Sequence, residues 1–70
     1  MYTITACTPD GMNSEVIATA PDLPTAAIVA ATWVRHPYIP GHTDVVACAT
    51  PADEQTGGYL FVDGRWEESW

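Results

Sequence analysis

Carboxylates are the side chains of this chain with the most obvious capacity for chemistry. The sequence holds nine Asp and Glu residues against two Arg and no Lys, so its formal net charge is −7 over 70 residues. Nearly half of the residues are hydrophobic, which is too large a share for a disordered acidic segment. The acidic residues therefore decorate a folded domain, and its anionic surface would repel nucleic acid and attract basic partners.

The acidic residues of the C-terminal half are the candidates for contacting such a partner. Alternate residues of a strand lie about 6.6 Å apart on one face, and alternate phosphates of a DNA strand rise by about 6.8 Å. Carboxylates gathered at a sheet edge or in its loops could therefore imitate phosphates. A terminal tryptophan is either an interface anchor beside these acids or packs back onto the sheet edge. We expect the partner-binding residues to be Asp53, Glu54, Asp63, Glu67, Glu68 and Trp70.

The cysteine and histidine residues of this chain do not have the spacing of a known metal-binding motif. Cys7, His36, His42 and Cys48 could in principle make a Cys2His2 set, but the chain has no C-x2-C motif. The two histidines are also separated by five residues that include two prolines, unlike any compact zinc motif. We therefore expect no metal and no cofactor.

Catalysis finds no better support. A reactive cysteine needs an electropositive setting, which a chain with two basic residues hardly offers. Glu67 and Glu68 could be an acid and base pair, but neighbouring strand residues face opposite sides. There is no GxGxxG sequence, no phosphate-binding loop and no basic patch, so nucleotide and direct nucleic-acid binding are excluded as well. We expect a non-enzymatic protein.

Five strands and one helix are predicted to position these residues. Residues 2–8, 14–20, 43–49, 59–62 and 65–69 have strand character, and turns are expected at Pro9-Asp10-Gly11 and Asp63-Gly64. Asp22 is suited to cap a helix that runs to Arg35, where Pro37 lies just beyond the helix end. The order β-β-α-β-β-β predicts a single α+β domain over residues 1–70, with the helix packed on an antiparallel sheet.

The predicted helix has an apolar stripe. Leu23, Ala26, Ala27, Ala30, Trp33 and Val34 follow helical spacing. Alanine would let the helix approach the sheet closely, and Trp33 would be its large filler. The stripe predicts that these residues form the core.

Two further expectations concern location and oxidation state. The longest apolar run is too short to span a membrane, and the N-terminus lacks the basic residues of a signal peptide. We expect a cytoplasmic monomer. In that compartment Cys7 and Cys48 would be reduced, buried thiols, although neighbouring strands could also bring them within disulfide distance.

The layout as a whole resembles the small anti-CRISPR proteins of phages and mobile elements. The resemblance rests on the hairpin YTITACTPDGMNSEVIATA, the helix PTAAIVAATWVRH and the terminal hairpin YLFVDGRWEESW, and it includes no diagnostic motif. It implies a stoichiometric inhibitor that binds a CRISPR surveillance complex. Acidic members are similar to DNA in charge and block the site that reads the PAM or holds duplex DNA, which uses Lys and Arg.

The acidity also has a simpler interpretation. Acidic surface residues commonly serve solubility, as in halophilic proteins, and the chain would then be a small interaction or structural module of a phage or a halophile. Salt-dependent binding to a basic surface would favour the inhibitor, whereas self-association alone would favour the module.

Overall fold

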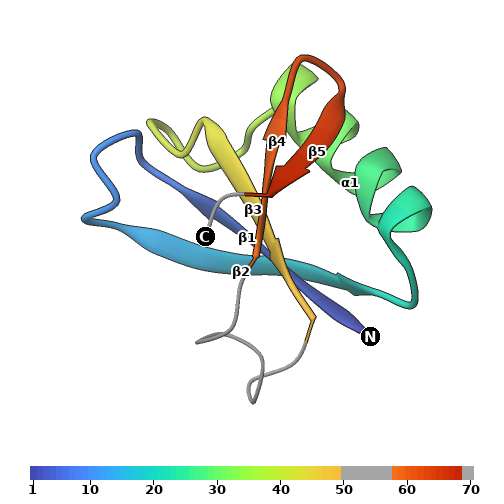
Figure 1. Cartoon of the computed structure of the whole chain (residues 1–70). Helices are drawn as coiled ribbons and strands as arrows, with labels where there is room; N and C mark the ends of the chain where they lie inside the picture. The colour runs from blue at the N-terminus through green and yellow to red at the C-terminus, as the bar shows by residue number, and fades with distance from the viewer. Residues whose placement is uncertain (50–57, 69–70) are drawn as a thin grey trace.

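The described part of the chain, residues 1–49 and 58–68 of a computed structural model, forms an antiparallel sheet with a helix on one face (Figure 1). The predicted α+β fold and its element order are confirmed. The elements follow one another as β1 (Tyr2–Cys7), β2 (Ser14–Ala20), α1 (Leu23–Arg35), β3 (Asp44–Cys48), β4 (Tyr59–Val62) and β5 (Arg65–Glu68).

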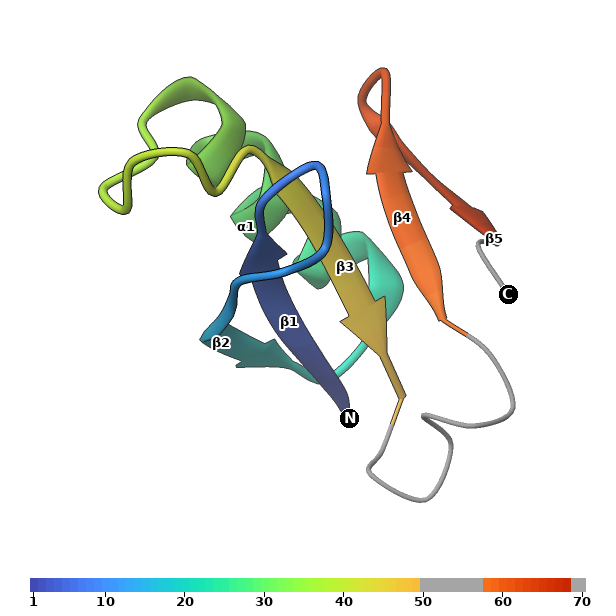
Figure 2. The same ribbon diagram turned by 90° about the vertical axis from the view of Figure 1, so that its left-hand side faces the viewer.

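The strands are arranged in the order β2-β1-β3-β4-β5. Every neighbouring pair is antiparallel, so β2 and β3 run in the same direction on either side of β1. The connection from β2 to β3 contains α1, which crosses the sheet over β1 on one face (Figure 2). The sheet edges among the described residues are therefore β2 on one side and β5 on the other.

The pairing of β1 with β2 is interrupted by a bulge. Ile4 lies opposite Ala18, but the next residue, Thr5, lies opposite Val16, which leaves Ile17 as an extra residue in β2. Both Ile17 and Ala18 consequently pack against the core on the helix side. A bulge on an edge strand also bends that edge and hinders the addition of another strand.

The core lies between α1 and the three strands beneath it. Its sheet layer is Ile4 and Ala6 of β1, Ala20 of β2 and Val45 of β3, and its helix layer includes Ala26 and Ala30. Alanine on both surfaces lets the helix backbone come close to the sheet, which a small core needs in order to exclude water. Trp33 fills the remaining space and is only 4% exposed, as predicted from its place in the helical stripe.

The buried stripe of α1 is narrower than the sequence pattern indicated. Ala26, Ala30 and Trp33 are buried, whereas Leu23 and Ala27 are half-buried. Val34, expected in the core, is 54% exposed. One sheet face covers only one side of a lone helix, so a residue at the margin of the apolar stripe projects beyond the sheet.

Both helix ends carry the expected signals. The Asp22 carboxylate accepts a hydrogen bond from the backbone N–H of Thr25 at 2.8 Å, and Pro24 occupies the first turn. Arg35 lies in the last turn, where its positive charge complements the helix dipole. The chain leaves the helix at His36, whose backbone N–H still donates to the carbonyl groups of Thr32 and Trp33.

Two indole N–H groups fasten other segments to the helix. The Trp66 indole donates to the carbonyl oxygen of Leu23 at 3.0 Å and ties β5 to the start of α1. Its ring packs edge-on against Phe61, with centroids 5.0 Å apart. The Trp33 indole donates to the carbonyl oxygen of His42 at 2.6 Å, which holds the connector after α1 against the end of the helix.

The two cysteines lie apart on the sheet. In the β1–β3 ladder Cys7 is opposite Asp44, whereas Cys48 is opposite Thr3. Four residues of strand separate them, about 13 Å at the usual rise, and no disulfide joins them. Both are half-buried rather than buried, because their strand positions alternate with those that face α1. Partial burial is the main cause that raises the pKa of the Cys7 thiol, and the negative charge of the nearby Asp44 carboxylate raises it further.

Candidate partner-binding surface

The β4–β5 hairpin carries the described part of the predicted acidic site. Asp63 and Gly64 form its two-residue turn with φ angles of 50° and 82°, the left-handed conformation that an Asp-Gly pair adopts readily. Phe61 then lies opposite Trp66, and Val62 opposite Arg65. The turn places the Asp63 carboxylate at the tip of the hairpin, exposed to solvent.

Glu67 and Glu68 project to opposite faces of the sheet. Trp66 reaches α1 through its indole N–H, so alternation along the strand places Glu68 on the helix side and Glu67 on the other side. Glu67 lies opposite Leu60 and Glu68 opposite Tyr59. Both carboxylates are exposed. The hairpin therefore gathers the two acids on one strand but not on one face, as the strand period indicated.

An ion pair involves one of these acids. Arg65 and Glu67 share the face away from α1, and the guanidinium lies 3.6 Å from the carboxylate. The two side chains are 76% and 51% exposed, so the pair contributes little to stability. It leaves the Asp63 and Glu68 carboxylates without an ion pair in the described residues. Three further predicted contacts, Asp53, Glu54 and Trp70, lie outside the residues that the structure describes.

Two other acids have local structural roles. The Asp10 carboxylate accepts hydrogen bonds from the Thr8 hydroxyl and from the backbone N–H of Met12 in the β1–β2 turn. Both bonds lower the pKa of Asp10, and the bond from Thr8 has the larger effect. Hydrogen bonds from Thr25 lower the pKa of the Asp22 carboxyl group; the bond from the Thr25 side chain has the larger effect and the bond from its backbone N–H the smaller one. These acids stabilise a turn and a helix end in their charged form.

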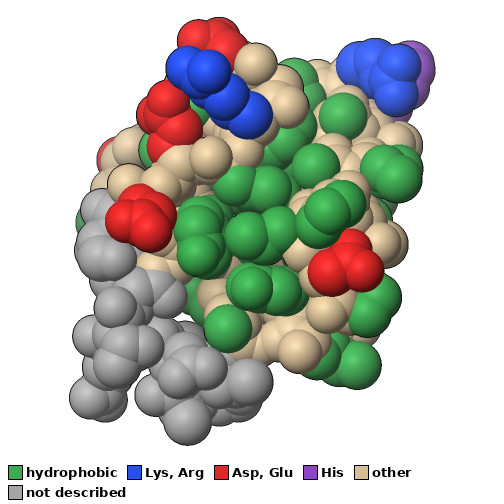
Figure 3. All heavy atoms as spheres, turned by 45° about the vertical axis from the view of Figure 1, so that its right-hand side comes forward, with side chains coloured by type: hydrophobic (Ala, Val, Ile, Leu, Met, Phe, Trp, Pro, Cys, Tyr) green, Lys and Arg blue, Asp and Glu red, His purple; other side chains and the backbone are tan. Residues whose placement is uncertain are grey.

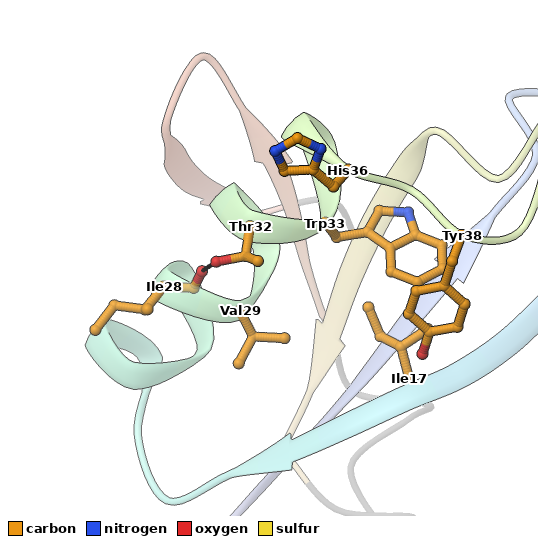
Figure 4. A pocket seen from close by; sticks show the side chains of 7 residues that line it. All are labelled: Ile17, Ile28, Val29, Thr32, Trp33, His36 and Tyr38. Atoms are coloured by element: carbon orange, nitrogen blue, oxygen red, sulfur yellow. Dashed lines mark hydrogen bonds between the residues drawn. The ribbon is translucent and has the colours of Figure 1, made fainter.

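A shallow apolar groove was not predicted. It has a volume of about 290 Å³ and is lined by Ile17, Ile28, Val29, Thr32, Trp33, His36 and Tyr38 (Figure 4). The Tyr38 ring packs edge-on against Trp33, with centroids 4.6 Å apart. The Thr32 hydroxyl donates back to the carbonyl oxygen of Ile28, so its donor is already used. The groove offers mostly apolar contact.

The groove depends on long-range structure. Ile17 reaches it through the bulge in β2, and Tyr38 comes from the connector held by the Trp33 indole. Exposed apolar residues in a predicted helix were the available sign, since α1 carries no charged residue from Leu23 to Val34. Ile28 is 68% exposed on that helix.

The described residues offer little to a metal. In residues 1–49 and 58–68, no group of three or more His, Cys, Asp or Glu residues comes close enough to hold one. A membrane-spanning helix, long and apolar enough to cross a bilayer, is also not found in this part of the chain.

Comparison of the chain with models of protein families, with curated proteins and with solved structures finds no match in any of the three.

Proposed function

We propose that this protein is a non-enzymatic anionic inhibitor that binds the basic, nucleic-acid-binding surface of a protein complex. A CRISPR surveillance complex is the partner class that its layout favours. The observation that carries the proposal is the state of the carboxylates. The described ones all lie at exposed or half-exposed positions, and in that part of the chain a single ion pair, Arg65–Glu67, neutralises one of them.

Exposed, uncompensated carboxylates suit docking on lysine and arginine. No charged residue of the described chain is buried, and the Asp63 and Glu68 carboxylates on the hairpin have no ion pair there, so their charge remains available to a partner. The same field would steer a basic partner to the protein and accelerate association. Asp63, Glu67 and Glu68 on the hairpin are the described contacts, and Asp53, Glu54 and Trp70 complete the proposed set.

The direct test is inhibition of DNA binding by purified surveillance complexes of different CRISPR types. The protein is titrated into a gel-shift assay with target duplex DNA. A targeted phage is also plated on bacteria that do or do not express the protein. We expect loss of DNA binding and recovery of plaques with at least one type. Undiminished DNA binding by every type would reject this partner.

A charge-matched pair of variants tests the surface. Glu67→Gln with Glu68→Gln removes two negative charges, and Glu15→Lys replaces one negative charge by a positive one, so both take the formal net charge from −7 to −5. Glu15 lies on β2, at the opposite edge of the sheet. We expect the hairpin variant to lose at least about tenfold in affinity and the Glu15 variant to lose less. Equal losses would show that only total charge matters.

A second candidate is supported by the dispersal of the acids. Glu67 and Glu68 face opposite sides, and Asp10 and Asp22 serve local structure, which suits a small interaction or structural module whose acidity maintains solubility. The two candidates differ in their response to salt. An inhibitor that recognises charge binds more weakly as ionic strength rises, whereas a module that binds through apolar contact does not.

A further inference from the structure

The outward side of α1 is an apolar surface beside the acidic hairpin. The helix has no charged residue before Arg35, although the whole chain carries a net charge of −7. Ile28 and Val34 are 68% and 54% exposed, and Ala27 and Ala31 lie half-buried between them. A helix that buries one side of itself usually carries polar residues on the other. The apolar helix face, defined here as Ala27, Ile28, Ala31 and Val34, departs from that rule.

This face and the hairpin belong to one continuous surface. The indole of Trp66 in β5 donates to the carbonyl oxygen of Leu23, the first residue of α1, so the hairpin lies against the start of the helix. Figure 3 views the side of the molecule on which α1 and β5 meet, and hydrophobic side chains fill its centre, while mostly acidic side chains, with arginine among them, lie around that centre. Glu68 projects on this same side of the sheet.

We propose that the apolar helix face and the hairpin together bind a protein surface that has an apolar centre bordered by lysine or arginine. The inference rests on the proposed function and adds the apolar part of its partner. Charge complementarity decides the occupant, because a partner that covers the apolar centre must meet the acidic margin as well. An apolar centre within a charged rim is the usual anatomy of a protein interface. A second copy of this chain would instead bring two acidic margins together.

Synthetic peptides can test this chemistry without the natural partner. A labelled amphipathic helical peptide of Leu and Lys presents apolar and basic groups together, and an oligolysine of equal charge presents the basic groups alone. Binding is measured by fluorescence anisotropy. The test variant is Ile28→Gln with Val34→Gln, which changes no charge. Its control is Val16→Gln, because Val16 is 65% exposed but lies opposite Thr5, on the sheet face away from α1.

We expect the Ile28/Val34 variant to bind the Leu/Lys peptide about tenfold more weakly than the wild type and oligolysine with unchanged affinity. The Val16 variant should bind both peptides within about twofold of the wild type. Circular dichroism and thermal unfolding check that each variant is folded. Unchanged affinity of the Ile28/Val34 variant for the Leu/Lys peptide, or an equal loss in the Val16 variant, would overturn the inference.

Two further measurements separate the possible failures. If the Glu67→Gln and Glu68→Gln variant binds both peptides as well as the wild type, the hairpin is not the charged site and the proposed function fails. If the Glu67→Gln and Glu68→Gln variant binds the peptides more weakly but the Ile28/Val34 variant binds them as the wild type does, the role of the apolar helix face is rejected and the proposed function stands. Sedimentation of the unbound protein tests the second copy. A wild-type dimer that the Ile28/Val34 variant converts to a monomer would assign the apolar helix face to self-association and overturn the inference.

Discussion

Trp66 contributes to the fold through its indole nitrogen as well as its ring. Its neighbours Arg65 and Glu67 are exposed, whereas Trp66 packs against Phe61 and hydrogen-bonds to Leu23. Trp66 alternates with charged residues along β5, a pattern in which the apolar residue faces the core. The pattern does not indicate the acceptor of the indole N–H, because a carbonyl group at a helix start has no sequence signature.

Trp66→Phe separates the hydrogen bond from the aromatic packing. The phenyl ring can still pack against Phe61, but the Leu23 carbonyl loses its indole donor. We expect the free energy of unfolding to fall by about 1–2 kcal/mol, measured by urea denaturation. Tyr38→Phe is a control that keeps an aromatic ring at a position 73% exposed, and it should have little effect. A Trp66→Phe protein as stable as the wild type would show that the hydrogen bond contributes nothing.

Asp22 links helix stability to pH. Hydrogen bonds from Thr25 lower its pKa below the ordinary value of 3.8 in the folded protein, so its contribution is present above that value and is lost as the pH falls through the lowered pKa. Asp22→Ala should therefore lower the Tm at neutral pH, and its difference from the wild type should shrink under strongly acidic conditions. Asp22→Asn, which keeps a capping side chain, should lose less. A difference that grows on acidification would contradict this assignment.

The β4–β5 hairpin combines a structural turn with a proposed binding role. Asp63 and Gly64 were recognisable as a turn because both positions require φ above zero. The opposite projection of Glu67 and Glu68 also followed from the period of a strand. What could not be foreseen was the contact of the hairpin with the start of α1, since it joins residues 43 positions apart.

Substitutions in the turn distinguish its two roles. Asp63→Asn removes the charge but retains a residue suited to this turn, so we expect an unchanged Tm and weaker binding to the basic partner or to oligolysine. Gly64→Ala keeps the charge but places a Cβ at a φ of 82°, which costs about 1–2 kcal/mol. Thermal unfolding and anisotropy on both variants make the comparison. If Asp63→Asn unfolds as easily as Gly64→Ala, the carboxylate has a structural role after all.

The arrangement of strands was only partly accessible from the sequence. Local turns predict that β1 pairs with β2 and β4 with β5. The central pairing of β1 with β3 joins Thr3 to Cys48, and no local signal specifies it. The groove was missed for the same reason, since Ile17 enters it only through a bulge whose position is set by the pairing of two strands. The exposure of Val34 likewise depends on how much of the helix the sheet covers.

The net charge of −7 acts on the whole molecule. Charges of one sign repel one another more strongly in the folded chain than in an expanded one, and salt shortens the range of that repulsion to about 10 Å at 0.1 M. We therefore expect the Tm to rise as sodium chloride is added at neutral pH, while binding to a basic partner weakens. Differential scanning calorimetry measures the first effect. A Tm that falls with salt would mean that favourable ion pairs dominate.

The alternation of β5 has a consequence for how this protein can evolve. Trp66, on the inner side, holds the strand to the helix through the carbonyl oxygen of Leu23. Arg65, Glu67 and Glu68 are exposed, and Arg65–Glu67 is a solvent-exposed ion pair. Mutations at these three positions can therefore accumulate without loss of the fold. Under selection to recognise a new partner, single substitutions could change the charges of β5 while Trp66 is retained.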